Sequence, residues 1–374
     1  MSKWRHREEG KAISKALLKD MSLKELRESK DFISNFLDLR KAQKLEQTYI
    51  RGTTNAIDYN GKDKVYVDYR FDGTATGRLS CAAYTAEKAM GVSFHTLPRE
   101  TKNNIRSIFV PPEDHAFVTI DYSTMELRVL AHLSREQGMI DAFNSGQDLH
   151  SYTGSLLFNK SIDEVTKQER QLAKTVSFLI VYGGGAFNLS ETMGISIKRA
   201  EGVVNSYKEV YPRVFRFMDY VHNFVRENEY AYTIFGRRRN LNDISSKDKG
   251  VQHRSLRQGF NFIVQSTSSD ILLFALLGLS QHYKAVNMKS KVVSTVHDSL
   301  ELVVPYDELE RAVTLAKIHM VECPHLKSIF DVNFLVPFEI ETIVGKSFGD
   351  GMEVEYAEGS VSNLQEIERS LGHA

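Results

Sequence analysis

A stripe of basic and aromatic residues recurs at helical spacing in the middle of the chain. Arg170, Lys174, Phe178 and Tyr182 follow one another at intervals of four residues. Each step of four turns about 40° around a helix, so the side chains share a stripe of roughly 120° over about 18 Å. Because cations neutralise phosphate oxygens and rings stack on planar bases, this stripe suits a nucleoside triphosphate. Taken alone, the pattern is more often an amphipathic helix whose basic side chains extend past buried rings.

Two aspartates far apart in the chain stand where short apolar segments end. Asp121 follows the apolar run 116–120, and Asp298 lies in a short turn between two apolar segments. Buried acids rarely persist without partners. Two carboxylates at one sheet edge suit Mg²⁺ ions, and a pair of such ions drives phosphoryl transfer. Taken alone, such aspartates are more often turn caps or salt-bridge partners.

The elements that must position these residues are predicted from periodicity and turn signals. The predicted strands cover 65–71, 116–120, 291–295, 300–304 and 334–343, and the last is expected to pair beside the hairpin formed by 291–304. The predicted helices cover 11–30, 31–50, 125–133, most of 139–230, and 260–279. The helix that carries the stripe begins with a capping box, Thr166 to Glu169, and ends at the glycines 183–185.

Composition sets limits on the class of protein. The 374 residues are 42% hydrophobic and 26% charged, as in soluble globular proteins, which excludes wholesale disorder and fibrous structure. No run approaches the roughly 18 apolar residues of a membrane span, and the N-terminus lacks the apolar core of a signal peptide. Two cysteines exclude a disulfide framework and a cysteine-based zinc site. We therefore expect a cytoplasmic protein, in the host cytoplasm if it is viral, with no membrane partner.

The charge is balanced overall but uneven along the chain. The 48 basic and 48 acidic residues give zero net charge, so nucleic-acid binding must come from local patches. Residues 237–257 hold seven basic and two acidic residues, and residues 1–30 hold nine basic and five acidic residues. Residues 350–374 hold one basic and six acidic residues, and we expect them to form a solvated tail.

Seven ordered blocks make the sequence resemble the A family of DNA polymerases, which includes bacterial DNA polymerase I and several phage enzymes. The three that resemble the polymerase motifs are DYSTMELRVLAHLS (121–134), RQLAKTVSFLIVYG (170–183) and STVHDS (294–299). The supporting blocks are TATGRLS (74–80), QDLH (147–150), TIFGRRRNLNDI (233–244) and RQGFNFIVQSTSSDI (257–271). The resemblance covers about 72–350 and implies a mixed α/β right-hand polymerase fold. The implied parts are a reduced thumb in 1–71, palm in 72–138 and 251–350, fingers in 139–250, and the acidic tail in 351–374.

The resemblance implies a DNA-directed DNA polymerase, a nucleotidyltransferase of DNA replication or repair, that adds dNTPs to a primer 3′-hydroxyl. By position, Asp121, Asp298 and the carbonyl of Tyr122 would bind two Mg²⁺ ions. Lys174 would also donate to the leaving pyrophosphate. The implied nucleotide-binding residues are Arg170, Lys174, Phe178, Tyr182, His150 and Glu126, the last as a steric gate against a ribose 2′-hydroxyl.

The resemblance also implies contacts with primer–template DNA. Four residues would read the minor groove near the primer terminus, where the acceptors are common to all base pairs. These four residues are Arg78, Arg257, Asn261 and Gln265. Arg237, Arg238 and Arg239 would contact phosphates, and His297, beside the second aspartate, would contact DNA.

The sequence departs from the family after the second aspartate, where the usual Glu is Ser299. Glu301 lies two residues on, and therefore on the same strand face. Our hypothesis is that Glu301 substitutes for the missing carboxylate, in which case Glu301→Gln should lower turnover.

The segment before the Thr-Gly-Arg motif is short. About 70 residues precede it, so we expect a reduced thumb and no 3′–5′ exonuclease domain in this chain. The chain would be a minimal polymerase, or the polymerase half of a split enzyme that works with a separate exonuclease and thumb chain or a processivity factor.

Two other classes of function stay open. A single-subunit RNA polymerase shares the aspartates and the stripe, but Glu126 and Phe178 argue against it. A catalytically weak or silent nucleic-acid-binding subunit is disfavoured by the intact aspartates and kept open by Ser299. The sequence does not separate a replicative from a repair or bypass role.

Overall fold

The computed structural model describes residues 35, 37–60, 63–83, 92–98, 104–357 and 359–372. The chain divides into two compact units, Met1–Asp68 with Ala82–Ser93, and Tyr69–Cys81 with Phe94–Ala374. In the first unit a helix that includes residues 37–44 continues through η1 (Leu45–Ile50) into α3 (Arg51–Asn60). The helix predicted to end at residue 50 therefore extends to residue 60. The helix predicted over 11–30 lies outside the described residues.

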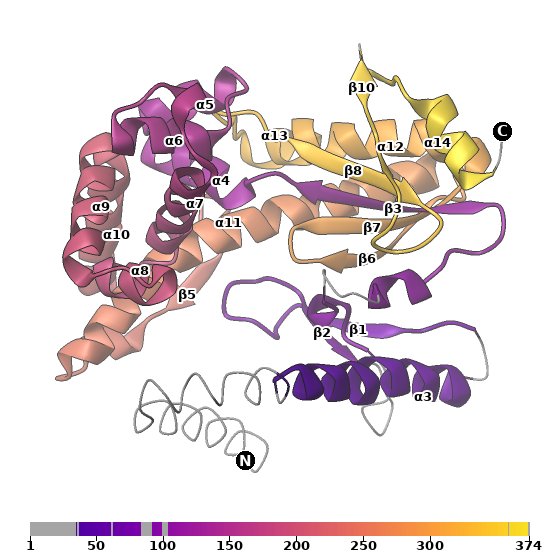
Figure 1. The fold of residues 1–374 in the computed structure, drawn as a ribbon, viewed down its shortest axis with the longest axis horizontal. Coiled ribbons are helices and arrows are strands. Elements are labelled where there is room, and N and C mark those ends of the chain that lie inside the picture. The colour runs from indigo at the N-terminus through magenta and orange to yellow at the C-terminus, as the bar shows by residue number, and fades with distance from the viewer. Residues whose placement is uncertain are drawn as a thin grey trace. The chain divides into compact units, whose positions relative to one another are not determined.

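The second unit contains a five-stranded antiparallel sheet that corresponds to the expected palm (Figure 1). Its strands, in spatial order, are β6 (Lys291–Val296), β7 (Ser299–Pro305), β3 (His115–Tyr122), β8 (Ile340–Gly345) and β9 (Met352–Glu353). The predicted hairpin is present as β6 and β7. The prediction that 334–343 pairs beside the hairpin was wrong, because β3 takes that edge of β7 and β8 pairs with the other side of β3.

The sheet has one apolar face and one face that is available for chemistry. On β3 the side chains of Ala116, Val118 and Ile120 are fully buried, and their neighbours Thr119 and Asp121 point to the opposite face. β7 repeats this alternation, with Leu300, Leu302 and Val304 on the buried face. The apolar alternation thus fixes which face carries the aspartates.

Between β3 and β6 the chain forms the helical lobe expected for the fingers (Figure 1). α4 (Met125–Ser134) lies in the segment predicted as palm, 72–138. The helices that follow it are α5 (Gln137–Asn144), α6 (Leu149–Phe158), α7 (Lys167–Val181), α8 (Ala186–Met193), α9 (Ile197–Val210) and α10 (Pro212–Asn228). A short hairpin of β4 (Tyr230–Tyr232) and β5 (Arg238–Asn240) follows. Strand β1 (Val67–Arg70) pairs with β2 (Ser80–Ala83). The remaining short helices are η2 (Phe94–Thr96), η3 (Ile105–Ile108), η4 (Ile162–Glu164), η5 (Asn242–Ser245) and η6 (Tyr306–Glu308).

Helix α11 (Lys249–Ala285) runs from the fingers to the sheet (Figure 1) and is longer than the predicted 260–279. The Asp248 side chain caps its first turn by accepting hydrogen bonds from the Gly250 and Val251 amides. One 18-residue window has a mean hydropathy of 1.6, so by length and composition α11 could cross a membrane, contrary to the expectation that no segment suits a membrane span. Because 67% of that window is buried inside the protein, we interpret α11 as the core helix of this unit.

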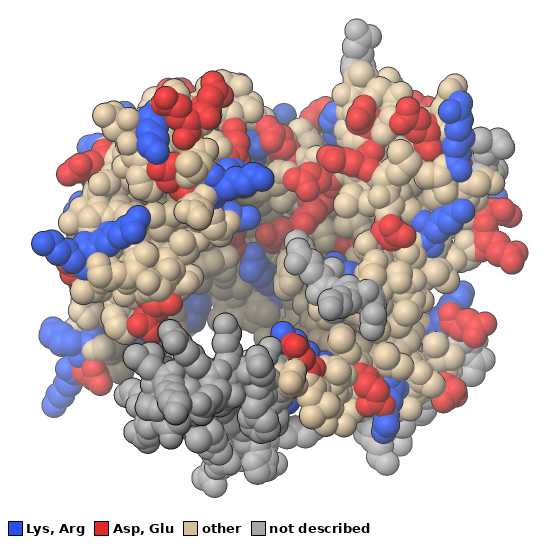
Figure 2. Space-filling view, in the orientation of Figure 1, with Lys and Arg blue, Asp and Glu red and all other residues tan. Residues whose placement is uncertain are grey.

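The end of the chain is folded onto the palm. α12 (Leu309–Lys317), η7 (Ile318–Glu322) and α13 (Pro324–Phe330) pack near α11, and β10 (Tyr356–Ala357), β11 (Ser360–Val361) and α14 (Leu364–Leu371) follow β9. Val361, Ile367 and Leu371 are buried. The prediction of a solvated tail after Asp350 was wrong, because apolar residues between the acidic ones anchor the segment. Both charge signs are interspersed over the visible described face, in agreement with the balanced composition (Figure 2).

A buried histidine beneath α11 makes stability depend on pH. His319 is 5% exposed, its Nε2 lies 3.0 Å from His282 Nδ1, and its ring lies 5.8 Å from that of His325. Burial, with smaller contributions from both neighbouring histidines, lowers the pKa of His319 to about 4. The neutral ring is therefore favoured in the folded protein, and its contribution is fully present above the unfolded pKa of about 6.5 and is lost as pH falls towards 4.

We expect the free energy of unfolding to fall by about 3 kcal/mol between pH 7 and pH 4 because of this group alone. His319→Gln should flatten that part of the stability profile, which urea unfolding at a series of pH values would measure. His253→Gln, at an exposed position of α11, is the matched control. Equal slopes for wild type and His319→Gln would contradict the assignment.

Candidate active site

The sheet brings the two candidate metal-binding aspartates to adjacent strand ends. Asp121 is opposite Ser299 in the β3–β7 register, and the Tyr122 amide donates a 3.3 Å hydrogen bond to the Asp298 carbonyl. Asp121 is the next-to-last residue of β3, whereas Asp298 lies in the two-residue turn between β6 and β7. Antiparallel pairing of distant segments thus places both carboxylates and the Tyr122 backbone in one place.

Side chains from outside the hairpin hold the turn that carries Asp298. His297 has a φ of 60°, a left-handed conformation that is uncommon for a residue other than glycine. Its ring stacks on His95 at 5.5 Å, and His95 Nε2 lies 2.9 Å from the Thr295 carbonyl oxygen. The Tyr69 hydroxyl lies 2.6 Å from Ser294 Oγ and donates to the same carbonyl at 2.9 Å. His297, predicted to contact DNA, therefore also packs within the protein.

Arg78 connects the aspartate site to the candidate steric gate. Its Nη2 lies 3.2 Å from Asp298 Oδ1 and 2.7 Å from Glu126 Oε1. Glu126 is 3% exposed; burial is the largest influence and raises its pKa, whereas Arg78 acts to lower it. The nearby Tyr182 and Gln265 side chains also act to lower that pKa. These contacts bring Arg78, Glu126, Tyr182, Gln265 and Asp298 together.

The donor set at this site fits a hard divalent cation. Within the described ranges, no group of three or more His, Cys, Asp or Glu side chains forms a closed metal site. Asp121 and Asp298 offer carboxylate oxygens next to the Tyr122 backbone. Mg²⁺ is typically bound by one or two carboxylates and completes its coordination with water and phosphate oxygens.

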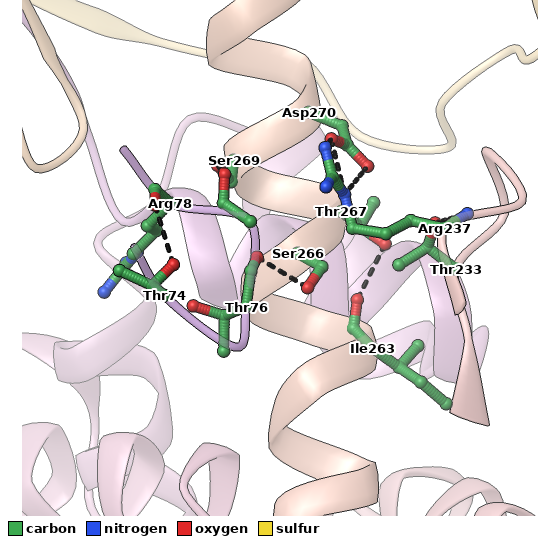
Figure 3. A network of polar contacts seen from close by, with 11 residues as sticks. Thr74, Thr76, Arg78, Thr233, Arg237, Ile263, Ser266, Thr267, Ser269 and Asp270 are labelled. Carbon is green, nitrogen blue, oxygen red and sulfur yellow. Dashed lines mark hydrogen bonds and ion pairs between the residues drawn. The ribbon is translucent and has the colours of Figure 1, made fainter. Parts of the chain in front are cut away.

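Helix α11 holds the turn that presents Arg78 (Figure 3). Ser266 Oγ donates to the Thr76 carbonyl at 2.7 Å, and Ser269 Oγ donates to the Gly77 carbonyl at 3.0 Å. Gly77 has a φ of 70°, and a Cβ there would lie 2.7 Å from the Arg237 guanidinium carbon. A glycine is therefore required at this turn for conformation and for space.

Arg237, which was predicted to contact DNA phosphates, forms an ion pair within the protein. Its guanidinium pairs with Asp270 of α11, with Nη2 2.6 Å and Nε 3.0 Å from Oδ1 (Figure 3). Asp270 therefore holds the Arg237 guanidinium in this structure, and the contact of Arg237 with DNA phosphates stays a prediction. Arg238 is exposed and lies over the Tyr230 ring at 3.8 Å. Arg239 is half-buried, and burial lowers its pKa.

Asp270→Asn should lower the free energy of unfolding by about 1–3 kcal/mol, because the Arg237 guanidinium would lose its charged acceptor. Asp270 is 5% exposed, so water does not replace the lost interaction easily. Asp243→Asn is the control, since the ion pair of Asp243 with Arg254 is exposed and 3.4 Å long. Urea unfolding measures both variants, and equal destabilisation by the two would contradict the structural role.

The basic and aromatic stripe lies on α7, on the side away from its buried residues. The predicted capping box is present, with Thr166 and Glu169 each accepting a hydrogen bond from the other's backbone amide. Arg170 and Lys174 are exposed, Phe178 is half-buried, and Tyr182, the C-cap residue, is 45% exposed. The rings of Phe178 and Tyr182 stack at 6.4 Å.

The two cations of the stripe differ in their partners. Arg170 donates to Asp148 from Nε and Nη2 at 2.8 and 2.9 Å. Burial acts to raise the pKa of Asp148, but hydrogen bonds from Arg170 and Ser151 lower it to about 2. The Lys174 ammonium makes no hydrogen bond or ion pair with the described residues, so its charge is available to a ligand.

His150 does not present its ring to solvent, as a phosphate contact would require. It is 2% exposed and packs against Phe178 at 5.9 Å, and neither ring nitrogen has a hydrogen-bond partner. Burial lowers its pKa to about 4. The interpretation of His150 as an open phosphate contact is therefore corrected for this conformation.

The minor-groove candidates line one side of α11. Arg257, Asn261 and Gln265 are spaced by four residues; Arg257 is exposed, and Asn261 and Gln265 are half-buried. Gly183 has a φ of 68°, and a Cβ there would lie 3.0 Å from Arg257 Cβ, so the end of α7 approaches α11 closely. Asn261 Oδ1 is buried without a hydrogen-bond partner.

Sequence reasoning missed Arg128, which positions the backbone after Asp121. Its Nε donates to the Ser123 carbonyl at 3.1 Å, its Nη1 donates to the Pro337 carbonyl at 2.6 Å, and its Nη2 pairs with Glu339. Arg128 is 3% exposed. An arginine flanked by the apolar residues Leu127 and Val129–Ala131 was the signal, since buried arginines require partners. Asp148, the partner of Arg170, was also given no role from the sequence.

A palm sheet with two aspartates at adjacent strand ends, together with a helix of basic and aromatic residues, defines the right-hand polymerase class. The family model for DNA polymerase family A matches residues 2–350, so the chain belongs to this family. This match begins far before residue 72, where the resemblance was thought to start. The chain is 33% identical over 305 residues to DNA polymerase I of Caldicellulosiruptor bescii, covering 82% of this chain and 35% of that protein.

Further similarities agree with this assignment. DNA polymerase I of Streptococcus pneumoniae is 35% identical over 298 residues, covering 79% of this chain and 33% of that protein. Among solved structures, the polymerase domain of Pol1 from M. smegmatis, in complex with DNA primer-template and dNTP, matches with a TM-score of 0.77 and 28% identity. That match covers 88% of this chain and 56% of the other. The chain thus spans about a third of the length of these DNA polymerase I relatives.

Proposed function

We propose that this chain is a template-directed DNA polymerase that adds dNTPs to a primer 3′-hydroxyl with two Mg²⁺ ions. The observation that carries the proposal is the placement of Asp121 and Asp298 at adjacent strand ends, with Arg78 bridging Asp298 and Glu126. Family membership and the DNA- and dNTP-bound structural relative support primer–template DNA and dNTPs as its partners.

Asp121, Asp298 and the Tyr122 carbonyl would hold the two ions. When bound, such ions activate the attacking hydroxyl and stabilise the charge that develops on the transferred phosphoryl group. Lys174 and Arg170 would bind the triphosphate, and Lys174 would donate to the departing pyrophosphate. The conformation with Arg170 on Asp148 then requires an exchange of partners when a nucleotide binds.

Glu126 would act as the gate that selects deoxynucleotides. Its side chain is 3% exposed and is held by Arg78, which leaves it little freedom to move away from an additional hydroxyl. Phe178 and Tyr182 would pack against the incoming nucleotide. Arg257, Asn261 and Gln265 on α11 would contact the minor groove, and Arg238 would contact phosphates.

The test is extension of a primed DNA template by the purified chain, with dNTPs and NTPs compared, in Mg²⁺ and after chelation. We expect template-directed products with dNTPs, few or none with NTPs, and none in chelator. Comparable extension with NTPs would favour an RNA polymerase. Tight primer–template binding without any extension would favour a catalytically silent subunit. Long products from the chain alone would argue against the split-enzyme arrangement.

A further inference from the structure

Glu301 is a buried carboxyl group on the active-site face of the sheet that the proposed reaction does not use. It is 1% exposed and lies opposite Thr119 in the register that pairs Ser299 with Asp121. Because paired residues in an antiparallel sheet share a face, the four side chains form one patch. The patch lies where this chain departs from the family, since Ser299 replaces the usual glutamate.

The contacts of Glu301 connect it to the turn that carries Asp298. Glu301 Oε1 lies 2.7 Å from Ser299 Oγ, and Thr119 Oγ1 donates to Glu301 Oε2. Ser299 Oγ also lies 2.9 Å from the carbonyl oxygen of Val296, the last residue of β6. A continuous path of hydrogen bonds therefore runs from Thr119 on β3, through Glu301 and Ser299, to the backbone at the start of the turn.

The number of hydrogens along this path indicates which group donates and which accepts in each hydrogen bond. The Ser299 hydroxyl has one hydrogen and two acceptors within reach, Glu301 Oε1 and the Val296 carbonyl. Both contacts are satisfied when a protonated Glu301 donates to Ser299 and Ser299 donates to Val296. Burial raises the pKa of Glu301 to about 7, against the opposing effect of the Thr119 and Ser299 hydrogen bonds, which is compatible with this direction.

We propose that Glu301 is a positioning residue for the metal site, acting through Ser299 on the turn that holds Asp298, and is not a third carboxylate ligand. This inference rests on the proposed function of Asp298 as a metal ligand. This path of hydrogen bonds, the relay, fixes the turn in a chain that has Ser299 where the family usually has glutamate. It also reverses the expectation that Glu301→Gln lowers turnover, because glutamine can accept a hydrogen bond from Thr119 and donate one to Ser299 as a protonated glutamate does.

The experiment compares Glu301→Gln, Glu301→Val, Ser299→Ala and the Glu301→Val/Ser299→Ala double variant. Mn²⁺ affinity is measured by EPR with primer–template DNA and a non-hydrolysable dNTP analogue, and kcat and KM for dNTP are measured separately. Residues that support metal ligands typically contribute 10–100-fold, so Glu301→Val should weaken Mn²⁺ binding and lower kcat by about 10-fold. Glu301→Gln should stay within about twofold of wild type, and the double variant should be no worse than the poorer single variant.

Val303→Ala is the matched control, because Val303 lies on the same strand face two residues further from the turn and is half-buried. It should lower stability but leave Mn²⁺ affinity unchanged. If Glu301→Gln lost as much Mn²⁺ affinity and kcat as Glu301→Val, the relay would be overturned, and the site would require the negative charge of Glu301. Unchanged Mn²⁺ affinity in Glu301→Val would also overturn it. If the wild type itself fails to extend primers, the proposed function fails, whereas extension with unaffected variants rejects only the relay.

Discussion

Primer extension by Asp298→Asn is expected to be at least about 10³-fold slower than extension by the wild type, because several kcal/mol of metal-dependent stabilisation would be lost. The substitution keeps the shape of the side chain and removes its charge. The turn should persist, since Tyr69 and His95 contact the Thr295 carbonyl rather than the carboxylate. The loss should therefore be catalytic and not structural.

The measurement is single-turnover incorporation of one dNTP in Mg²⁺, with urea unfolding and primer–template binding measured in parallel. Asp307→Asn is the control, since Asp307 is exposed and lies just beyond the far end of β7. An Asp298→Asn rate within tenfold of wild type, with normal DNA binding, would remove Asp298 from the metal site.

Lys174→Ala should lower the rate of nucleotide incorporation by about 10²–10³-fold, the usual effect of removing one preorganised donor from a developing charge. Lys174 is exposed and makes no ion pair with the described residues, so its removal leaves no uncompensated partner. Arg170→Ala should have the smaller catalytic effect, because the Asp148 carboxylate already neutralises Arg170 in this conformation.

Single-turnover rates at saturating dNTP separate loss of chemistry from loss of binding. Lys198→Ala on α9 is the control, since it removes an exposed lysine from another helix of the same lobe. If Lys174→Ala raised only the dNTP concentration needed for half-maximal rate, Lys174 would bind phosphates without assisting the departure of pyrophosphate.

The position of Arg78 shows how the site is organised. Its guanidinium contacts both Asp298 and Glu126, so one cation serves a metal-site carboxylate and the candidate gate. The turn that presents it is fixed by Ser266 and Ser269 of α11. Rigid support of this kind keeps the reacting groups in place before substrates arrive.

Local elements and the residues at their ends were predictable from the amino-acid sequence. The capping box at Thr166 and Glu169, the buried strand that precedes Asp121 and the hairpin around Asp298 were all predicted, because each depends on residues a few positions apart. The ordered motifs likewise indicated that Asp121 and Asp298 belong to one site, and the structure brings them to adjacent strand ends.

The tertiary structure alone decided which distant groups meet. That β8 pairs with β3, that Asp270 holds Arg237, that His150 is buried and that the C-terminal segment folds onto the palm depend on competition among segments far apart in the chain. The same holds for Glu301, whose strand face was predictable but whose partners Thr119 and Ser299 were not assigned. Periodicity records which face of an element is apolar, whereas the partner of a polar side chain is set by whichever donor or acceptor packing brings within about 3 Å of it.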